Sequence, residues 1–253
     1  ADIYHIANPS TWLGKWNLLH QWQGVPWSGV GSELENNARG MVDMTLLRPP
    51  DLVVCDGLVG IYTGPTREPL GQSDMACILA STDPVAADTI QCLAMGYKID
   101  SVPSLTRAAS KGLGTNNPGK IEVRGYRVKD IRRWFSSYGC AVAGDRNAPT
   151  MSGLSIADGT HVCGQLHVAP ASPADSNPGL CKGELYVDGL LVDSSDANGY
   201  KTSWLVGNQS EGAHTATYIL YDRMLNEAPL SKTVYVHKGD PVRSALGLAD
   251  GAA

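Results

Sequence analysis

The stretch ILASTDPVAADTIQCLAMGY, residues 78–97, decides how the first half of the chain is interpreted. An apolar run ends just before Asp83, a residue type that commonly caps helices. Pro84 follows, and proline is tolerated best at the first position of a helix. Gly96 is a natural stop, because glycine readily adopts the left-handed conformation found after helix ends. The stretch therefore predicts a strand, a cap and a helix that runs to about Met95.

The surrounding sequence predicts an α/β domain over residues 41–146. Two apolar runs, DLVVC at residues 51–55 and MACILA at residues 75–80, are typical of strands buried on both faces. A further helix is expected at residues 103–111 and a short strand at residues 121–123. Buried strands that alternate with helices predict a mainly parallel sheet.

The composition changes near residue 147, and residues 147–238 predict an all-β, immunoglobulin-like sandwich. Asp188-Gly189 is a strong signal for a tight turn between two strands. About seven short strands in roughly 90 residues is the density typical of such a sandwich. Residues 239–253 remain as a C-terminal tail.

Residues 1–40 form a segment rich in tryptophan that we interpret as a possible docking arm. Tryptophan is common in protein cores, but it is also enriched among the residues that anchor interfaces. The β-prone start of the chain could add a strand to the sheet edge of a neighbouring copy. The candidate assembly residues are Ile3, Tyr4, Ile6, Trp12, Trp16, Trp22 and Trp27.

Composition excludes several classes of function. The net charge of −5 and the absence of a strong Lys and Arg cluster argue against a nucleic-acid-binding surface. No apolar run reaches the 18 or so residues that a membrane-spanning helix needs. The chain begins Ala1-Asp2-Ile3 without methionine, which is typical of an exported protein after removal of its signal peptide. We therefore expect an extracellular or cell-surface protein.

Six cysteines in an exported chain suggest disulfides. Cys163 and Cys181 lie near polar loop sequence and are the candidates for a bridge, whereas Cys55, Cys77 and Cys92 lie in apolar runs and could equally be free buried thiols. No cysteine spacing fits zinc or an iron–sulfur cluster, so neither is expected. Another export-related feature is the triplet Asn208-Gln209-Ser210, which matches a glycosylation acceptor at Asn208.

Two parts of the chain resemble known families. PDLVVCDGLVG at residues 50–60, the stretch at residues 78–97 and GLGTNNPGKIEVRG at residues 112–125 resemble the domain of unknown function family 362, over about residues 36–125. Members of that family often carry a ferredoxin-like cysteine cluster, which this chain lacks. GELYVDGLLVDSS at residues 183–195, with the strands that follow, resembles the immunoglobulin-like repeats of bacterial surface proteins over about residues 150–238. The resemblance implies a spacer, adhesion or assembly module.

Three aspartates are the candidates for a catalytic or metal site. Asp56 and Asp83 each follow a predicted strand, and ligands bind outside the carboxyl ends of parallel strands. Asp88 lies within the next helix and could face the same crevice. Paired carboxylates there could hold a divalent metal or serve as acid and base. The alternative is that Asp83 caps a helix, Asp56 belongs to a turn and Asp88 interacts with the helix dipole.

These observations lead to one main hypothesis and two alternatives. The main hypothesis is an extracellular structural subunit of a filament, tube or surface layer, which binds copies of itself and needs no cofactor. The first alternative is a secreted metal-dependent enzyme or ligand-binding protein that uses Asp56, Asp83 and Asp88. The second is a cell-surface adhesin whose sandwich loops bind glycans.

Overall fold

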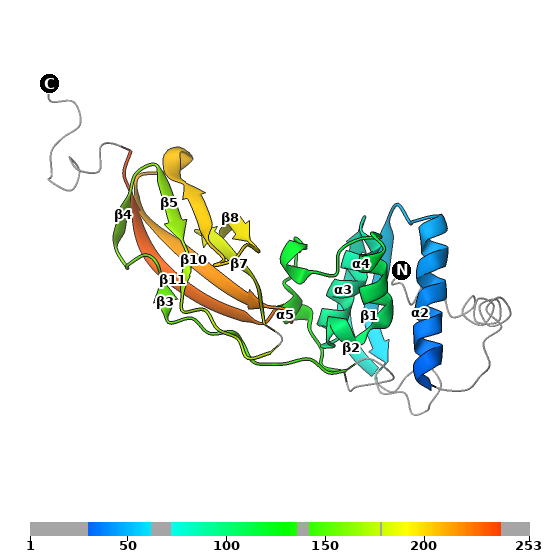
Figure 1. Cartoon of the computed structure of the whole chain (residues 1–253). Coiled ribbons are helices and arrows are strands. Elements are labelled where there is room, and N and C mark those ends of the chain that lie inside the picture. The colour runs from blue at the N-terminus through cyan, green and yellow to red at the C-terminus, as the bar shows by residue number, and fades with distance from the viewer. Residues whose placement is uncertain (1–29, 62–71, 136–141, 178, 239–253) are drawn as a thin grey trace, which may run out of the picture. The chain divides into compact units, whose positions relative to one another are not determined.

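The computed structural model describes residues 30–61, 72–135, 142–177 and 179–238. The chain divides into two compact units, Ala1–Asp145 and Arg146–Ala253 (Figure 1). Among the described residues, no helix is both long enough and apolar enough to cross a membrane.

Helix α3 (Pro84–Ala94) is the centre of the first unit. All its residues except Gln91 are buried, so it is covered on every side. The other elements, in chain order, are α2 (Val30–Leu47), β1 (Val53–Ile61), β2 (Gln72–Ser81), the 3-10 turn Ile99–Ser101, α4 (Pro103–Ser110), the 3-10 turn Pro118–Lys120 and α5 (Val128–Ile131). The strands β1 and β2 pack on one side of α3, and α2 packs against α4.

The two strands of this unit run antiparallel, so the predicted parallel sheet is wrong. Val53 pairs with Ser81 at one end of the ladder, and Ile61 pairs with Gln72 at the other. Ten residues separate the two strands, and a parallel crossover needs a dozen or more. The strand expected at residues 121–123 is also absent, because this segment makes no ladder. The described part of this unit therefore contains helices and a two-stranded hairpin in place of the expected α/β sheet.

The helix signals in residues 78–97 are confirmed. Helix α3 begins at Pro84 with Asp83 as its cap, and its last turn closes through the Met95 N–H. Gly96 follows with a φ of 76°, in the left-handed region. The local chemistry of this stretch thus specifies both ends of the helix.

In the described residues of the second unit, the regular elements are all strands apart from one 3-10 turn, Val206–Asn208. Its main sheet has the strand order β4-β11-β10-β7-β8, and β4 pairs parallel with the end of β11. Two further pairs, β3–β6 and β5–β9, complete the unit. The strands are β3 (Gly153–Leu154), β4 (Thr160–Val162), β5 (Gln165–Val168), β6 (Pro170–Ala171), β7 (Leu180–Val187), β8 (Leu190–Ser195), β9 (Thr202–Leu205), β10 (Gly212–Asp222) and β11 (Glu227–Val236).

One apolar core joins the main sheet to the β5–β9 pair. Val168 of β5 and Trp204 of β9 belong to the same buried cluster as Leu185 of β7 and Tyr218 of β10. The hairpin between β7 and β8 turns at Asp188-Gly189, and both residues have positive φ, as a type I′ turn requires. The unit is therefore a two-layered β structure. This strand order alone does not establish an immunoglobulin-like fold.

We expect Gly183→Ala to destabilise the second unit. A methyl group at Gly183 would overlap the hydroxyl of Tyr218, which is fully buried and donates a hydrogen bond to the carbonyl of Tyr200 at 2.6 Å. Overpacking of this kind costs about 2 kcal/mol. Urea unfolding measures the loss. Gly153→Ala is the matched control, because nothing lies within 4 Å of its added methyl group. Equal midpoints for the two variants would contradict the packing argument.

Candidate functional site

Asp83 joins three segments of the first unit through its carboxylate. Its Oδ1 accepts hydrogen bonds from the N–H groups of Val85 and Ala86, at 2.8 and 2.9 Å. Its Oδ2 accepts from the N–H of Thr115 at 3.0 Å, across 32 residues of chain. A side chain at Gly114 would clash with this carboxylate, so the loop can approach only as glycine. Asp83 thus caps α3 and holds the loop after α4.

The other two candidate aspartates do not join Asp83 in a ligand cluster. Asp56 is exposed in the middle of β1, where its Oδ1 accepts from the N–H of Leu58 at a bulge. Asp88 is buried within α3. The crevice expected at the ends of parallel strands requires a parallel sheet, whereas the described strands of this unit run antiparallel. In the part of the chain that the structure describes, no group of three or more His, Cys, Asp or Glu side chains could hold a metal.

Two replacements of Asp83 separate its cap on α3 from its bond to Thr115. We expect Asp83→Ala to lower the free energy of unfolding by about 2 kcal/mol, because it removes the cap and the bond to Thr115. Asp83→Asn should lose about half as much, because its one amide oxygen keeps the cap on Val85 and Ala86 while its NH2 group cannot accept from the N–H of Thr115. Urea unfolding of both variants measures the difference. If the two variants lost equal stability, the charge of Asp83 would be the essential feature instead of its capping geometry.

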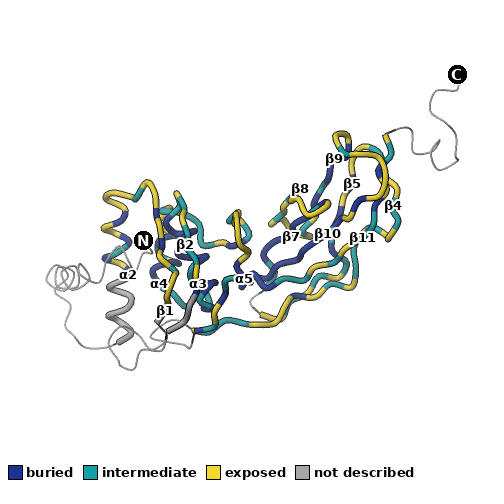
Figure 2. Tube along the Cα trace, turned by 180° about the vertical axis from the view of Figure 1, so that it is seen from behind, coloured by how far each residue is buried: buried dark blue, intermediate teal, exposed yellow. Residues whose placement is uncertain are grey.

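The hairpin of β1 and β2 exposes one apolar face. Val53 and Cys55 point the other way and are buried with Ala87 of α3. The side chains that we call the hairpin face, Leu52, Val54, Leu58 and Ile78, are 61%, 55%, 51% and 68% exposed. Figure 2 shows exposed residues along β1 in yellow. Contiguous exposed apolar side chains commonly mark interaction sites.

The same hairpin forms a sheet of its own among the described residues. Its sheet contains only β1 and β2, so each strand has a strand neighbour on one side alone. Open edges present backbone groups that can pair with another strand. The residues predicted to supply such a strand, Ile3, Tyr4 and Ile6, lie outside the described residues, as do the four tryptophans of the arm and the tail at residues 239–253.

The predicted bridge between Cys163 and Cys181 is not formed. Both are free thiols, as are Cys55, Cys77 and Cys92. Cys163 follows β4, which pairs with the end of β11, and that end of β11 pairs with the start of β10. Cys181 instead lies beside Asp222, at the end of β10. That strand separates them by about 30 Å, and a disulfide needs Cα atoms within about 7 Å. Cys181 instead donates to the carbonyl of Asp222, and burial raises the pKa of its thiol to about 12.

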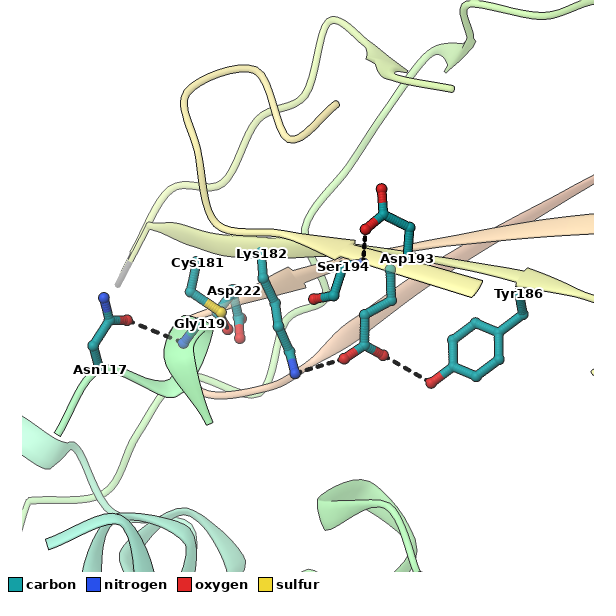
Figure 3. Close-up of polar contacts among 9 residues, drawn as sticks. Asn117, Gly119, Cys181, Lys182, Tyr186, Asp193, Ser194 and Asp222 are labelled. Carbon is teal, nitrogen blue, oxygen red and sulfur yellow. Dashed lines mark hydrogen bonds and ion pairs between the residues drawn. The ribbon is translucent and has the colours of Figure 1, made fainter. Parts of the chain in front are cut away.

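Strand β7 carries a buried ion pair that was not predicted from the sequence. Lys182 Nζ lies 2.7 Å from Glu184 Oε1, and the Tyr186 hydroxyl donates to Glu184 Oε2 at 2.8 Å (Figure 3). The ring of Tyr221 lies beneath the Lys182 ammonium, 5.0 Å away. Burial acts to raise the pKa of Glu184, but Lys182 and the hydrogen bonds outweigh it and the pKa is lowered. The alternation of Lys182, Glu184 and Tyr186 was the visible signal for a shared face.

His214 has a serine and an aspartate beside it but does not form a catalytic triad. Its Nδ1 lies 2.6 Å from Asp188 Oδ2, and its Nε2 lies 2.9 Å from the carbonyl oxygen of Ser210 and 3.4 Å from that residue's hydroxyl. Two acceptors at the two ring nitrogens favour the protonated imidazolium, which has no lone pair to act as a base. The hydrogen bonds to Asp188 and Ser210 accordingly raise the pKa of His214. The arrangement joins β10 to the turn between β7 and β8 and to the segment before β10.

The contribution of His214 to stability should depend on pH. Its pKa is raised from 6.5 in the folded chain, so its stabilising effect is complete below about pH 6.5 and is lost as pH rises through the folded pKa. We expect His214→Gln to cost about 1 kcal/mol at pH 5.5 and less at pH 9. Urea midpoints at the two pH values measure this change. His167→Gln, at an exposed position on β5, is the control. An equal cost of His214→Gln at both pH values would refute the charge-based account.

Comparison with known families supports part of the predicted resemblance. Residues 9–93 match the model of a family described as a domain of unknown function, DUF362. About a third of the chain is thus similar to DUF362. The matched range starts within the tryptophan-rich segment and ends inside α3, so it differs at both ends from the expected residues 36–125. Gly114 and Thr115, which contact Asp83, lie beyond it.

The solved structures that resemble this chain do so weakly. Fibronectin(III)-like modules of Clostridium thermocellum CbhA share 21% identity, with 36% of this chain and 100% of that chain covered and a TM-score of 0.28. The endo-beta-1,4-mannanase from Thermotoga petrophila shares 15%, over 38% of this chain and 21% of that chain, with a TM-score of 0.30. Latent PorU from Porphyromonas gingivalis shares 17% identity, over 38% of this chain and 11% of that chain, with a TM-score of 0.29. No curated protein matches the chain. Likenesses this weak establish neither fold nor function.

Proposed function

We propose that the chain is a self-associating structural subunit, and the observation that carries this proposal is the exposed hairpin face. Four large apolar side chains, one just before β1 and three within the strands, are more than half exposed on this hairpin. Helix α3 covers the other face of this hairpin, so a second layer would bury the face that is still exposed. Asp56 lies opposite Ile78 and adds one carboxylate to this exposed region. A mostly apolar partner surface fits such a face.

The occupant that we propose is the N-terminal segment of a second copy. Residues 1–7 precede the stretch that matches DUF362, so they are available for a role outside that domain. Ile3 and Tyr4 together with Ile6 make a short β-prone run. Such a run can add to a sheet through its backbone while its side chains cover the adjoining apolar face. In this arrangement each subunit supplies a strand and receives one.

The second unit would then act as a spacer between assembly points. The resemblance of residues 150–238 to immunoglobulin-like repeats of bacterial surface proteins supports that role and an extracellular or cell-surface location. The exposed position of Asn208 at the end of a 3-10 turn is compatible with glycosylation there.

Deleting residues 1–7 should prevent assembly. The deletion removes the added strand, and Ile78→Asp should have the same effect because it places a charge in the hairpin face. Light scattering after size exclusion measures the mass, which should fall to that of one chain in both variants, 26.8 kDa for Ile78→Asp and slightly less for the deletion. Leu205→Asp, at another exposed leucine in the second unit, is the matched control and should assemble normally.

The same measurement separates this proposal from its main rival, in which the segment covers its own hairpin. Removing a segment that acts within one chain would uncover the face and increase association. A larger mass after deletion would therefore show that the segment covers the hairpin of its own chain and not that of a second copy. An intact chain that is already a clean monomer at high concentration would refute self-assembly altogether.

A further inference from the structure

Two histidines from opposite ends of the second unit meet on one face of its main sheet. His161 is the middle residue of β4, and His237 directly follows β11. Nδ1 of His161 and Nε2 of His237 face each other 2.5 Å apart, although 76 residues separate them in the chain. Their ring centroids are 4.8 Å apart and the rings are nearly parallel, at 11°. Two imidazole nitrogens thus converge on one point.

The backbone beneath the two rings is held firmly. Strand β4 pairs parallel with β11, and the N–H of His237 donates to the carbonyl of Val162 at 2.9 Å. The side chains of Val162 and Val236 point into the core on the other face and are buried. The His161 ring also stacks on Tyr235, with centroids 5.1 Å apart. The pair is therefore preorganised, which lowers the cost of binding a ligand.

We propose that His161 and His237 form a two-ligand site for a first-row transition-metal dication, with Cu2+ bound most tightly. Neutral imidazole nitrogen is a favoured ligand of copper, nickel and zinc, and Cu2+ stands highest in the affinity order. In the metal-free pair, one ring nitrogen donates its proton to the other. Metal binding requires a lone pair on each of the two facing nitrogens. The one N–H proton of each neutral ring must then lie on the other nitrogen, Nε2 of His161 and Nδ1 of His237.

The geometry needs only a small adjustment to admit the ion. Metal–nitrogen bonds of about 2.0 Å place the two nitrogens of a bent site roughly 3 Å apart. His161 is exposed, so rotation of its side chain can open that gap. No group of three or more metal-binding side chains occurs in the described ranges, so water would occupy the remaining positions. Glu211, whose carboxylate accepts from the N–H of Lys238, adds negative charge beside this strand end.

Copper titration of the full chain without a histidine tag tests the site. Calorimetry should give one Cu2+ bound through the pair, and electron paramagnetic resonance should show coupling to two nitrogens. His161→Phe and His237→Phe keep an aromatic ring on the sheet and should weaken this binding at least tenfold. His167→Phe is the matched control at an exposed histidine of β5 and should bind as the natural chain does.

Thermal unfolding without metal verifies that each variant folds, and it gives a readout independent of binding. Added Cu2+ should raise the melting temperature of the natural chain and of the His167→Phe variant but not of the other two. The proposal is overturned if His161→Phe or His237→Phe binds Cu2+ as tightly as the natural chain. It is equally overturned if the natural chain binds no Cu2+, in which case the pair is a shared-proton hydrogen bond alone.

Discussion

The carboxylate of Asp83 is the contact on which the first unit depends most. It accepts three backbone N–H groups, two from the first turn of α3 and one from Thr115 in the loop after α4. The first N–H groups of any helix have no partner within the helix, and leaving them unpaired next to a buried core is costly. Because Asp83 satisfies them, α3 can be buried on all sides. The same acid also ties the end of β2 to a loop 32 residues later.

Features that depend on neighbouring residues could be predicted, whereas strand direction could not. The cap at Asp83, the stop at Gly96 and the turn at Asp188-Gly189 each follow from local backbone chemistry. An apolar run, in contrast, is the same in a parallel and an antiparallel sheet. The prediction ended the first strand at residue 55 and began the next at 75, which left room for a crossover. The strands continue to 61 and start at 72, so the connection is too short for one.

Contacts between distant residues account for the rest of what the sequence did not reveal. Lys182, Glu184 and Tyr186 alternate visibly, yet their partner Tyr221 comes from a strand that the alternation does not identify. His161 and His237 meet only because β4 pairs parallel with the last strand, a rare direction in this unit. The expected Cys163–Cys181 bridge failed for the same reason, since β10 separates two residues that are near each other in the sequence. Which distant residues meet in space can therefore be predicted only when the order of the strands is known.

Magnitudes indicate which kind of partner the hairpin of β1 and β2 can bind. Burying a large apolar side chain completely is worth about 1.5–3 kcal/mol, so the four half-exposed residues of the hairpin face offer roughly 3–6 kcal/mol. Association costs about 4–15 kcal/mol, so a flat apolar surface that covered this face alone would bind weakly. An extended strand can also form backbone hydrogen bonds with a sheet, and each adds about 0.5–1.5 kcal/mol. Edge and face are therefore best used together, which favours a partner that binds as a strand.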